Sequence, residues 1–591
     1  MKQMFTTFSQ RCGLFAGSIA FVVAAVTPPS LSDETKPKGS IIQPVLAEHG
    51  MVSAQEAVAT RIGVEILQRG GNAVDAAVAV GFALSVTLPR AGNLGGGGFM
   101  MVHEAATGKV HAIDYREIAP AAATRGMFLD AAGEYDRIKA VGSHISVGVP
   151  GTVAGFAMAI ERFGTMSLAE VIQPALKLAS EGIVVTRGLA DSLTSRRKEK
   201  LARWPASREI FFKPDGSTYD IGEVWPQRDL AWSLEQIAEN GPSAFYSGEI
   251  AGRLVEEMAV NGGLITRADL AGYRVIMREP VRGTYRGREI VSMPPPSSGG
   301  VHLIQILNVL EEFDIAGMGH NSAASIHVMT EAMKFAYADR SWYLGDPDYW
   351  KVPVTGLTSK SYAMETMKRI DLAKARSADE IGPGLPKQHE GRNTTHFSVV
   401  DKDGNVVSNT YTLNLAYGTG IVAAGTGILL NNEMDDFSAK ENEPNWFGLV
   451  GRKANAIEPE KRMLSSMTPT IVLKDGEPFL VTGSPGGSTI ITTTLQVILN
   501  VIDHGMNLSD AVASPRFHHQ WRPDRVIHEE TAFTTQTKNE LLQMGHRNVN
   551  IHPGYYGGGI GDANSVMKLP DGYVGVSDPR NAGGAKGVRE N

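Results

Sequence analysis

The stretch Asn393-Thr394-Thr395-His396-Phe397-Ser398-Val399-Val400-Asp401 stands where the character of the sequence changes. Before it, residues 150–330 alternate helical periodicity with short turns, and after it short β-rich runs become frequent. The turn sequence Asp401-Lys402-Asp403-Gly404-Asn405 follows and leads into a second β-rich run, Val406–Thr412. Two β-rich runs on either side of an Asp-Gly turn predict a β-hairpin.

Two helices are predicted well before this hairpin. Ser53 with Glu56 is typical of a capping box, and the helix that follows would end at Gly70-Gly71. Asn72 with Asp75 predicts the start of a second helix, which continues to Val86. This second helix is almost wholly Ala and Val, so we expect it to be buried on most faces.

Helices and strands alternate along the rest of the chain. Further helices are expected over Val153–Arg162, Leu168–Ser180, Ala231–Glu239, Ile250–Met258 and Thr489–Val501, and a strongly amphipathic one over Ser322–Asp339. Strands are expected over Met100–Val102, Val110–Asp114, Met467–Leu473 and Pro478–Thr482. Strand-rich segments interleaved with helices predict an α/β fold in which helices cover the sheets.

Composition and charge indicate a globular protein and argue against several other classes. The 591 residues are 42% hydrophobic and 20% charged, which is ordinary globular usage and excludes a disordered or fibrous chain. The net charge of −7 and a pI near 6.1 argue against a nucleic-acid partner, which usually requires a basic surface. Acidic and basic residues are interspersed, so neither an acidic tail nor a basic arm is visible.

The first 26 residues have the pattern of a secretory signal peptide. Lys2 and Arg11 precede an apolar run from Gly13 to Val26, which is too short for a membrane anchor. We therefore expect a periplasmic or secreted protein, with an exported linker over residues 27–45. The single cysteine, Cys12, lies inside this leader. A processed chain would contain no disulfide, thiolate metal site or cysteine nucleophile.

Several short stretches resemble metal, nucleotide or nucleophile motifs but do not have the residue spacing that those motifs require. Asp401-x-Asp403-x-Asn405 resembles the opening of a calcium loop but lacks its Gly and Glu positions, so the hairpin turn is favoured. Gly95–Gly98 has no following Lys-Ser/Thr, which argues against a nucleotide loop. His518-His519 has no ligand-spaced partner and is interpreted as structural. Thr482–Ser488 lacks the pattern of a nucleophile elbow, although it offers paired backbone N–H groups.

The stretch 393–401 also resembles a known family when it is taken together with other segments. These segments are Tyr411–Asn414, Leu430–Ser438, Leu464–Met467 and Gly483–Ser488, supported by Ala91–Met100, Asp114–Glu117, Pro294–Gly300, Arg516–Trp521 and Gly561–Ser565. In this order they resemble the γ-glutamyltranspeptidases, which belong to the N-terminal nucleophile hydrolases. The resemblance covers nearly all of the exported chain.

The resemblance implies a four-layer αββα sandwich built jointly by two fragments of one precursor. The precursor would cut itself between Asn393 and Thr394, giving a large subunit of residues 27–393 and a small catalytic subunit of residues 394–591. The two fragments would remain together as a heterodimer, because neither could bury its sheet face alone.

The implied chemistry centres on Thr394. Cutting would free its α-amino group, whose reference pKa is near 7.7–8.0, so a useful fraction is neutral at mild pH. That amine could take the proton from the hydroxyl of the same residue, which then acts as the nucleophile. The resemblance implies no metal and no organic cofactor.

The resemblance also implies roles for the remaining site residues. Gly486 and Gly487 would supply backbone N–H groups to the oxyanion, and Thr412 would assist the cut. Arg116, Ser465 and Ser466 would bind the substrate α-carboxylate. Asn414, Glu433 and Asp436 would bind the α-ammonium.

Three functions therefore remain to be compared. The first is a γ-glutamyltransferase and glutathione hydrolase, which acts on glutathione and related γ-glutamyl compounds and passes the acyl group to water or to amino acid or dipeptide acceptors. The second is a glutaryl-type acylase, which Asp436 disfavours because a glutaryl group has no ammonium to pair with it. The third is an uncut, non-catalytic periplasmic protein that binds amino acids.

One departure from the family pattern lies in residues 439–451, which match a lid over the γ-glutamyl pocket. Many members have a tyrosine there, whereas this chain has Trp446-Phe447. Phe447 has no hydroxyl to bond with Asn414, so we expect the closed lid to depend on apolar packing.

Overall fold

Two antiparallel sheets form the centre of the fold in the computed structural model, which describes residues 42, 44–195, 197–386, 396–552 and 559–588. Sheet I has the order β1 (Val45–Ala47), β20 (Gly572–Val576), β19 (Ser565–Leu569), β15 (Glu477–Thr482), β14 (Thr470–Lys474), β9 (Arg288–Ser292) and β8 (Val281–Tyr285). Sheet II has the order β21 (Gly584–Gly587), β2 (Gly50–Ala54), β10 (Phe397–Asp401), β11 (Val406–Thr412), β3 (Gly97–Glu104), β4 (Lys109–Tyr115) and β7 (Ile276–Arg278). The predicted leader, Asn393 and Thr394 lie outside the described residues.

The two sheets pack face to face through an apolar layer. Met51, Phe99 and Val400 of sheet II meet Val291, Ile471 and Val481 of sheet I in one buried cluster. Alternation along each strand sends the intervening side chains to the opposite face, where helices cover them.

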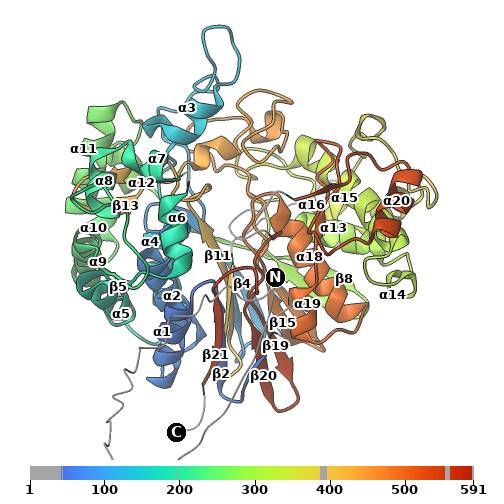
Figure 1. The fold of residues 1–591 in the computed structure, drawn as a ribbon, viewed down its shortest axis with the longest axis horizontal. Helices are drawn as coiled ribbons and strands as arrows, with labels where there is room; N and C mark the ends of the chain where they lie inside the picture. The colour runs from blue at the N-terminus through green and yellow to red at the C-terminus, as the bar shows by residue number, and fades with distance from the viewer. Residues whose placement is uncertain (1–41, 43, 196, 387–395, 553–558, 589–591) are drawn as a thin grey trace, which may run out of the picture. The chain divides into compact units, whose positions relative to one another are not determined.

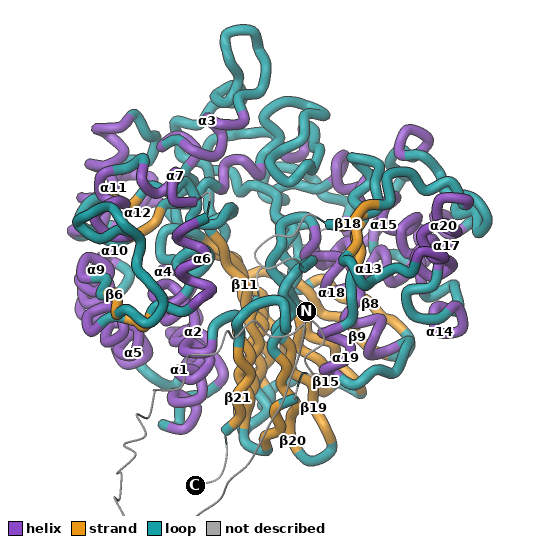
Figure 2. The backbone as a smooth tube through the Cα atoms, viewed as in Figure 1, coloured by secondary structure: helices purple, strands orange, loops and turns teal. Residues whose placement is uncertain are grey.

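Helices cover the outer face of each sheet (Figures 1 and 2). The layer on sheet II contains α1 (Ala57–Gln68), α2 (Ala73–Thr87), α4 (Thr152–Phe163), α5 (Leu168–Glu181), α9 (Arg228–Asn240) and α11 (Glu249–Asn261). The layer on sheet I contains α13 (Gly299–Leu310), α15 (Ala323–Tyr343), α17 (Lys360–Met367), α18 (Thr489–Ile502), α19 (Leu508–Ala513) and α20 (Thr535–Gln543). The predicted αββα architecture is confirmed.

Segments from before residue 387 and after residue 395 alternate within both sheets. In sheet II, β10 and β11 lie between β2 and β3, so two late strands are inserted among early ones. In sheet I, β14 pairs with β9 and β20 pairs with β1, again joining late strands to early ones. Neither part of the chain forms a complete sheet alone.

The predicted hairpin at Asp401 is confirmed, and its turn also caps a helix. The Asp401 carboxylate accepts the backbone N–H groups of Asp403 and Asn405, both at 3.0 Å. Its other oxygen accepts the backbone N–H of Ala73 at 2.9 Å, at the start of α2. The carboxylate is therefore satisfied by N–H donors, as expected of an Asx-type turn rather than a calcium loop.

Two expectations about helices are wrong. Ser53 does not cap α1, because it lies in β2 and donates its hydroxyl to Val576 O at 2.8 Å; the Glu56 side chain caps instead. The helix expected over Ser322–Asp339 is not amphipathic, since α15 buries every residue from Ser325 to Ser341. By contrast, α2 begins at the predicted Asn72–Asp75 capping box and is buried along its whole length.

Asp75 also joins α2 to the loop before α5, and this predicts a stability effect. Its buried carboxylate accepts from Asn72 N at 2.8 Å, Thr165 Oγ1 at 2.5 Å and Met166 N at 3.1 Å. Asp75→Ala removes the acceptor that these part-buried donors share, so the free energy of unfolding should fall by about 1–3 kcal/mol. Glu170→Ala, which removes the exposed capping box of α5, is the matched control and should lower the apparent melting temperature less. Equal melting temperatures for the two variants would contradict this account.

Within the described ranges, no helix is both long enough and apolar enough to cross a membrane.

Candidate active site

A cavity of about 280 Å³ opens where β10 begins and β11 ends. Its wall includes the start of β10, the end of β11, the loop before α18 and the loop before β19. Most of the predicted site residues line it, namely Thr412, Asn414, Glu433, Asp436, Trp446, Phe447, Ser465, Ser466, Gly486 and Gly487. Arg116 does not line it, and Asn393 and Thr394 fall outside the described residues.

Gly486 and Gly487 lie at the N-terminal end of α18. Their φ angles are +135° and +58°, a region that L side chains rarely adopt, so only glycine fits without strain. A Cβ on Gly487 would come within 2.4 Å of the Phe447 ring. The first N–H groups of a helix have no intrahelical acceptor and lie at the positive end of its dipole, so an anion is stabilised there.

Arg116 lies just behind the cavity among three carboxylates. Its guanidinium donates to Asp436 Oδ2 at 2.7 Å and to Glu433 Oε1 at shorter range, with Glu117 Oε2 at 3.5 Å. Burial raises the pKa of Glu433 well above its usual range and that of Glu117 to about 7, against the pull of Arg116. Arg116 therefore joins the two acidic residues at the cavity wall, and its predicted contact with a substrate carboxylate stays a prediction.

Ser465 and Ser466 are held in the cavity wall by the segment before α13. Ser465 O accepts from Ser298 N at 2.8 Å and Ser465 N donates to Pro296 O at 2.8 Å. The Ser466 hydroxyl accepts from Arg340 Nη2 at 3.3 Å. The Ser-Ser pair is thus fixed by backbone pairing on one side and by a buried guanidinium on the other.

Thr412 and Asn414 form a tight turn where β11 ends. The Thr412 hydroxyl accepts from Asn414 N at 2.8 Å, and the Asn414 amide donates to Asn432 O at 2.9 Å. Asn414 has a φ of +70°, a conformation that asparagine tolerates better than most residues. Thr412 at the end of β11 and Asn414 in the turn both line the cavity.

The predicted lid, residues 439–451, lies against Gly487 through Phe447. Phe447 packs on Gly487, and its backbone O accepts from Gln520 Nε2 at 3.1 Å. Asn445 Nδ2 donates to Asp436 Oδ1 at 3.3 Å, and Trp446 N donates to Asp435 Oδ2 at 3.1 Å. Backbone and amide hydrogen bonds therefore hold this segment in addition to the apolar contact of Phe447, and its role as a lid stays a prediction.

Several residues to which the sequence analysis assigned no role also line the cavity. His396 is one; burial lowers its pKa to about 3, and its ring bonds to Ser398, Ser408 and Asn564 O. Others are Gln55, Arg90, Gln520, Arg525, Asp562 and Asn581. His396, Gln520 and Asp562 lie in segments that resemble the family, whereas Gln55, Arg90, Arg525 and Asn581 lie outside them and carry no local signal.

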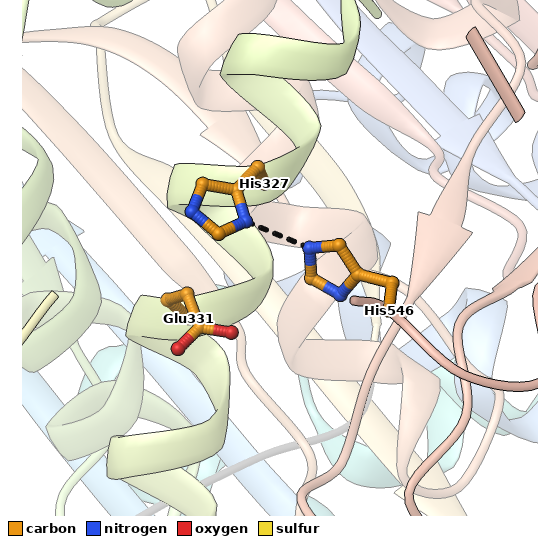
Figure 3. A group of neighbouring side chains, drawn as sticks. All are labelled: His327, Glu331 and His546. Atoms are coloured by element: carbon orange, nitrogen blue, oxygen red, sulfur yellow. Dashed lines mark hydrogen bonds between the residues drawn. The ribbon is translucent and has the colours of Figure 1, made fainter. Parts of the chain in front are cut away.

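The described residues also contain one group with the composition of a metal site, and none of its members lines the cavity (Figure 3). His327 and Glu331 lie one turn apart on α15, and His546 follows α20. His327 Nε2 donates to Asp371 O at 2.7 Å, so its Nδ1 accepts from His546 Nε2 at 2.8 Å. Lys334 already supplies Glu331 with a cation at 2.7 Å, and we therefore interpret the group as a hydrogen-bonded part of the core.

The sequence was matched by one protein family and by several characterised relatives. The sequence profile of the γ-glutamyltranspeptidase family matches residues 59–588. The chain belongs to the γ-glutamyltranspeptidase family. A relative from Escherichia coli K12, named glutathione hydrolase proenzyme, is 53% identical over 94% of this chain and 95% of its own length.

Solved structures support the same assignment of fold. A cephalosporin acylase from Bacillus halodurans covers 95% of this chain and 100% of its own, with 29% identity and a TM-score of 0.84. A γ-glutamyltranspeptidase chain from Helicobacter pylori is 43% identical, with a TM-score of 0.56; it matches 60% of this chain over 99% of its own length. This γ-glutamyltranspeptidase therefore shares its αββα core with transpeptidases and acylases alike.

Proposed function

We propose that this γ-glutamyltranspeptidase is a γ-glutamyltransferase and glutathione hydrolase with Thr394 as its nucleophile. The observation that carries the proposal is the cavity itself, which brings acidic side chains, a serine pair and the Gly486-Gly487 pair together near the start of β10. His396 lines the cavity, and Thr394 precedes it by two residues in the sequence. The named E. coli relative supports the substrate class.

The reaction proceeds through an ester on Thr394. Its hydroxyl oxygen attacks the γ-amide carbonyl while its own α-amine takes the hydroxyl proton. The N–H groups of Gly486 and Gly487 stabilise the negative oxygen of the tetrahedral intermediate. The amide C–N bond then breaks, and the departing amine, which is cysteinylglycine for glutathione, takes the proton. Water or an amino acid or dipeptide amine attacks the ester in the second half.

The charges along the cavity support both halves of this reaction. Asp436 and Glu433 are suited to the α-ammonium of the γ-glutamyl group, and Ser465 and Ser466 to its α-carboxylate. Elsewhere the wall carries Arg90, Arg525 and Asp562. A wall with both signs of charge suits an acceptor that bears both an amine and a carboxylate.

Precursor processing belongs to the same proposal. A cut between Asn393 and Thr394 gives fragments 27–393 and 394–591, which remain associated as a heterodimer. The E. coli relative is named a proenzyme, and the H. pylori chain matches about the share of this chain that residues 27–393 represent. The leader pattern of residues 1–26 supports a periplasmic or secreted location.

The test is to purify the protein, separate its chains on a denaturing gel and sequence their N-termini. We expect two chains, the smaller starting at Thr394, and turnover of a γ-glutamyl anilide in preference to a glutaryl anilide. The structural likeness to a cephalosporin acylase makes the glutaryl substrate the proper comparison. A single inactive chain that binds amino acids, or a preference for the glutaryl substrate, would overturn the proposal.

Asp436→Asn tests what selects the γ-glutamyl group. Removing the charge that pairs with the α-ammonium should lower kcat/KM for the γ-glutamyl anilide by about 10–100-fold, because a hydrogen bond to a charged group is lost. Turnover of the glutaryl anilide should fall much less. Asp435→Asn is the matched control, since Asp435 is a buried neighbouring carboxylate that does not line the cavity. A similar loss for both substrates in Asp436→Asn would contradict this role.

A further inference from the structure

Arg340 is a buried cation beside the active site, and its hydrogen bonds go to hydroxyls rather than to a carboxylate. It lies near the end of α15 with 4% of its surface exposed. Its side chain donates to two hydroxyls, with Nε 3.1 Å from Ser298 Oγ and Nη2 3.3 Å from Ser466 Oγ. In the described part of the chain no carboxylate oxygen forms a salt bridge with it.

Arg116 shows the opposite arrangement a short distance away. Three carboxylates, Glu117, Glu433 and Asp436, contact its guanidinium. Burial lowers the pKa of Arg340 to about 10, with Asp436 acting in the opposite direction, so the group is still charged at neutral pH. A buried charge without a direct partner is costly, and its retention needs a reason.

The bond to Ser466 supplies a geometric reason. A serine hydroxyl has one hydrogen to donate and lone pairs to accept. Because the guanidinium has no lone pair to offer, Ser466 Oγ must be the acceptor in this contact, which leaves its hydrogen for another partner. Ser466 lines the cavity, so that hydrogen is available to a bound anion.

We propose that Arg340 is a positioning residue for the α-carboxylate of the γ-glutamyl group. It orients the Ser466 hydroxyl as a donor and supplies the positive charge that a carboxylate at this end of the cavity requires. The inference rests on the proposed function and extends it, since it assigns selection for the α-carboxylate to a residue outside the cavity lining. Asp436 would select the ammonium and Arg340 the carboxylate.

The test compares two competitive inhibitors of γ-glutamyl anilide hydrolysis. L-Glutamate carries the α-carboxylate, whereas 4-aminobutyrate is the same molecule without it. In Arg340→Met the inhibition constant for L-glutamate should rise about 10–100-fold, while that for 4-aminobutyrate stays nearly constant, so their ratio collapses. KM for the anilide should rise more than kcat falls. Arg340→Lys, which keeps the charge but loses the planar fork, should restore part of the ratio.

Lys334→Met is the matched control. Lys334 is a second buried cation on α15, but it pairs with Glu331 and does not contact the active site. It should lower stability while leaving the inhibitor ratio unchanged. Ser466→Ala should collapse the ratio, and adding Arg340→Met to it should change the ratio little further, because both act on one contact.

Two outcomes would overturn the inference. One is an unchanged inhibitor ratio in Arg340→Met, and the other is an equal loss of affinity for both inhibitors. If Arg340→Met is not processed, calorimetric binding of the two amino acids to Arg340→Lys decides instead, and a ratio of affinities equal to that of the unmodified protein would overturn the inference. Failure of the proposed function is distinguishable, since the unmodified protein would then hydrolyse no γ-glutamyl anilide at all.

Discussion

Thr394→Ala should leave one unbroken chain and should lower γ-glutamyl turnover by about 10⁴–10⁶-fold, the loss typical of removing a nucleophile. Alanine has no hydroxyl to attack the preceding carbonyl during the cut or the substrate amide afterwards. The effect is large because one residue supplies the nucleophile and, once freed, the base. A denaturing gel measures the first result, and the hydrolysis rate of a γ-glutamyl anilide measures the second.

Thr395→Ala is the matched control, because it removes the same side chain one position later. It should still be cut before Thr394 and should retain most of its turnover. The nucleophile would be wrongly assigned if Thr394→Ala gave two chains or kept its activity. Turnover by an uncut chain would equally refute the need for a free amine.

Gly487→Ala should lower kcat by about 10²–10³-fold, the typical cost of losing one oxyanion donor. The new methyl group would meet the Phe447 ring at 2.4 Å in a backbone conformation with φ of +58°. Either the N–H turns away from the oxyanion or the lid is pushed off it. Steady-state kinetics on the processed enzyme should show kcat falling more than KM rises.

Gly505→Ala separates this local effect from backbone strain in general. Gly505 has nearly the same φ, +61°, but no atom lies within 4 Å of an added Cβ. It should cost a little stability and leave kcat unchanged. If both glycine variants lowered kcat to the same extent, strain rather than oxyanion geometry would explain the loss.

Short sequence patterns correctly predicted those elements that are held by hydrogen bonds between near neighbours in the chain. The Asn72–Asp75 capping box and the Asp401 hairpin are confirmed, because their hydrogen bonds join residues within a few positions. Ser53 was wrongly assigned to a cap because pairing with β10 and β21 extends β2 through that position. Strand pairing between distant segments overrides a local capping preference.

The site was predictable only where residues fall into family motifs. Those motifs named most of the cavity wall, but they did not reveal that Arg116 pairs with Glu433 and Asp436. Arg340 gave no signal, since an arginine at the end of a helix that is predicted to be amphipathic is expected on its solvent-exposed face. Its burial follows from packing of α15 against α13 and against the segments after residue 484, which no periodicity in 322–339 encodes.

The alternation of early and late strands has a consequence for recovery after denaturation. While the chain is continuous, β10 and its neighbours in sheet II are tethered, and their meeting costs only the closure of a loop. Once the bond before Thr394 is cut, the same pairing becomes an encounter between two separate molecules, whose rate depends on protein concentration. If the chain is cut there as proposed, a heated mature enzyme at high dilution should recover far less of its structure than its uncut precursor.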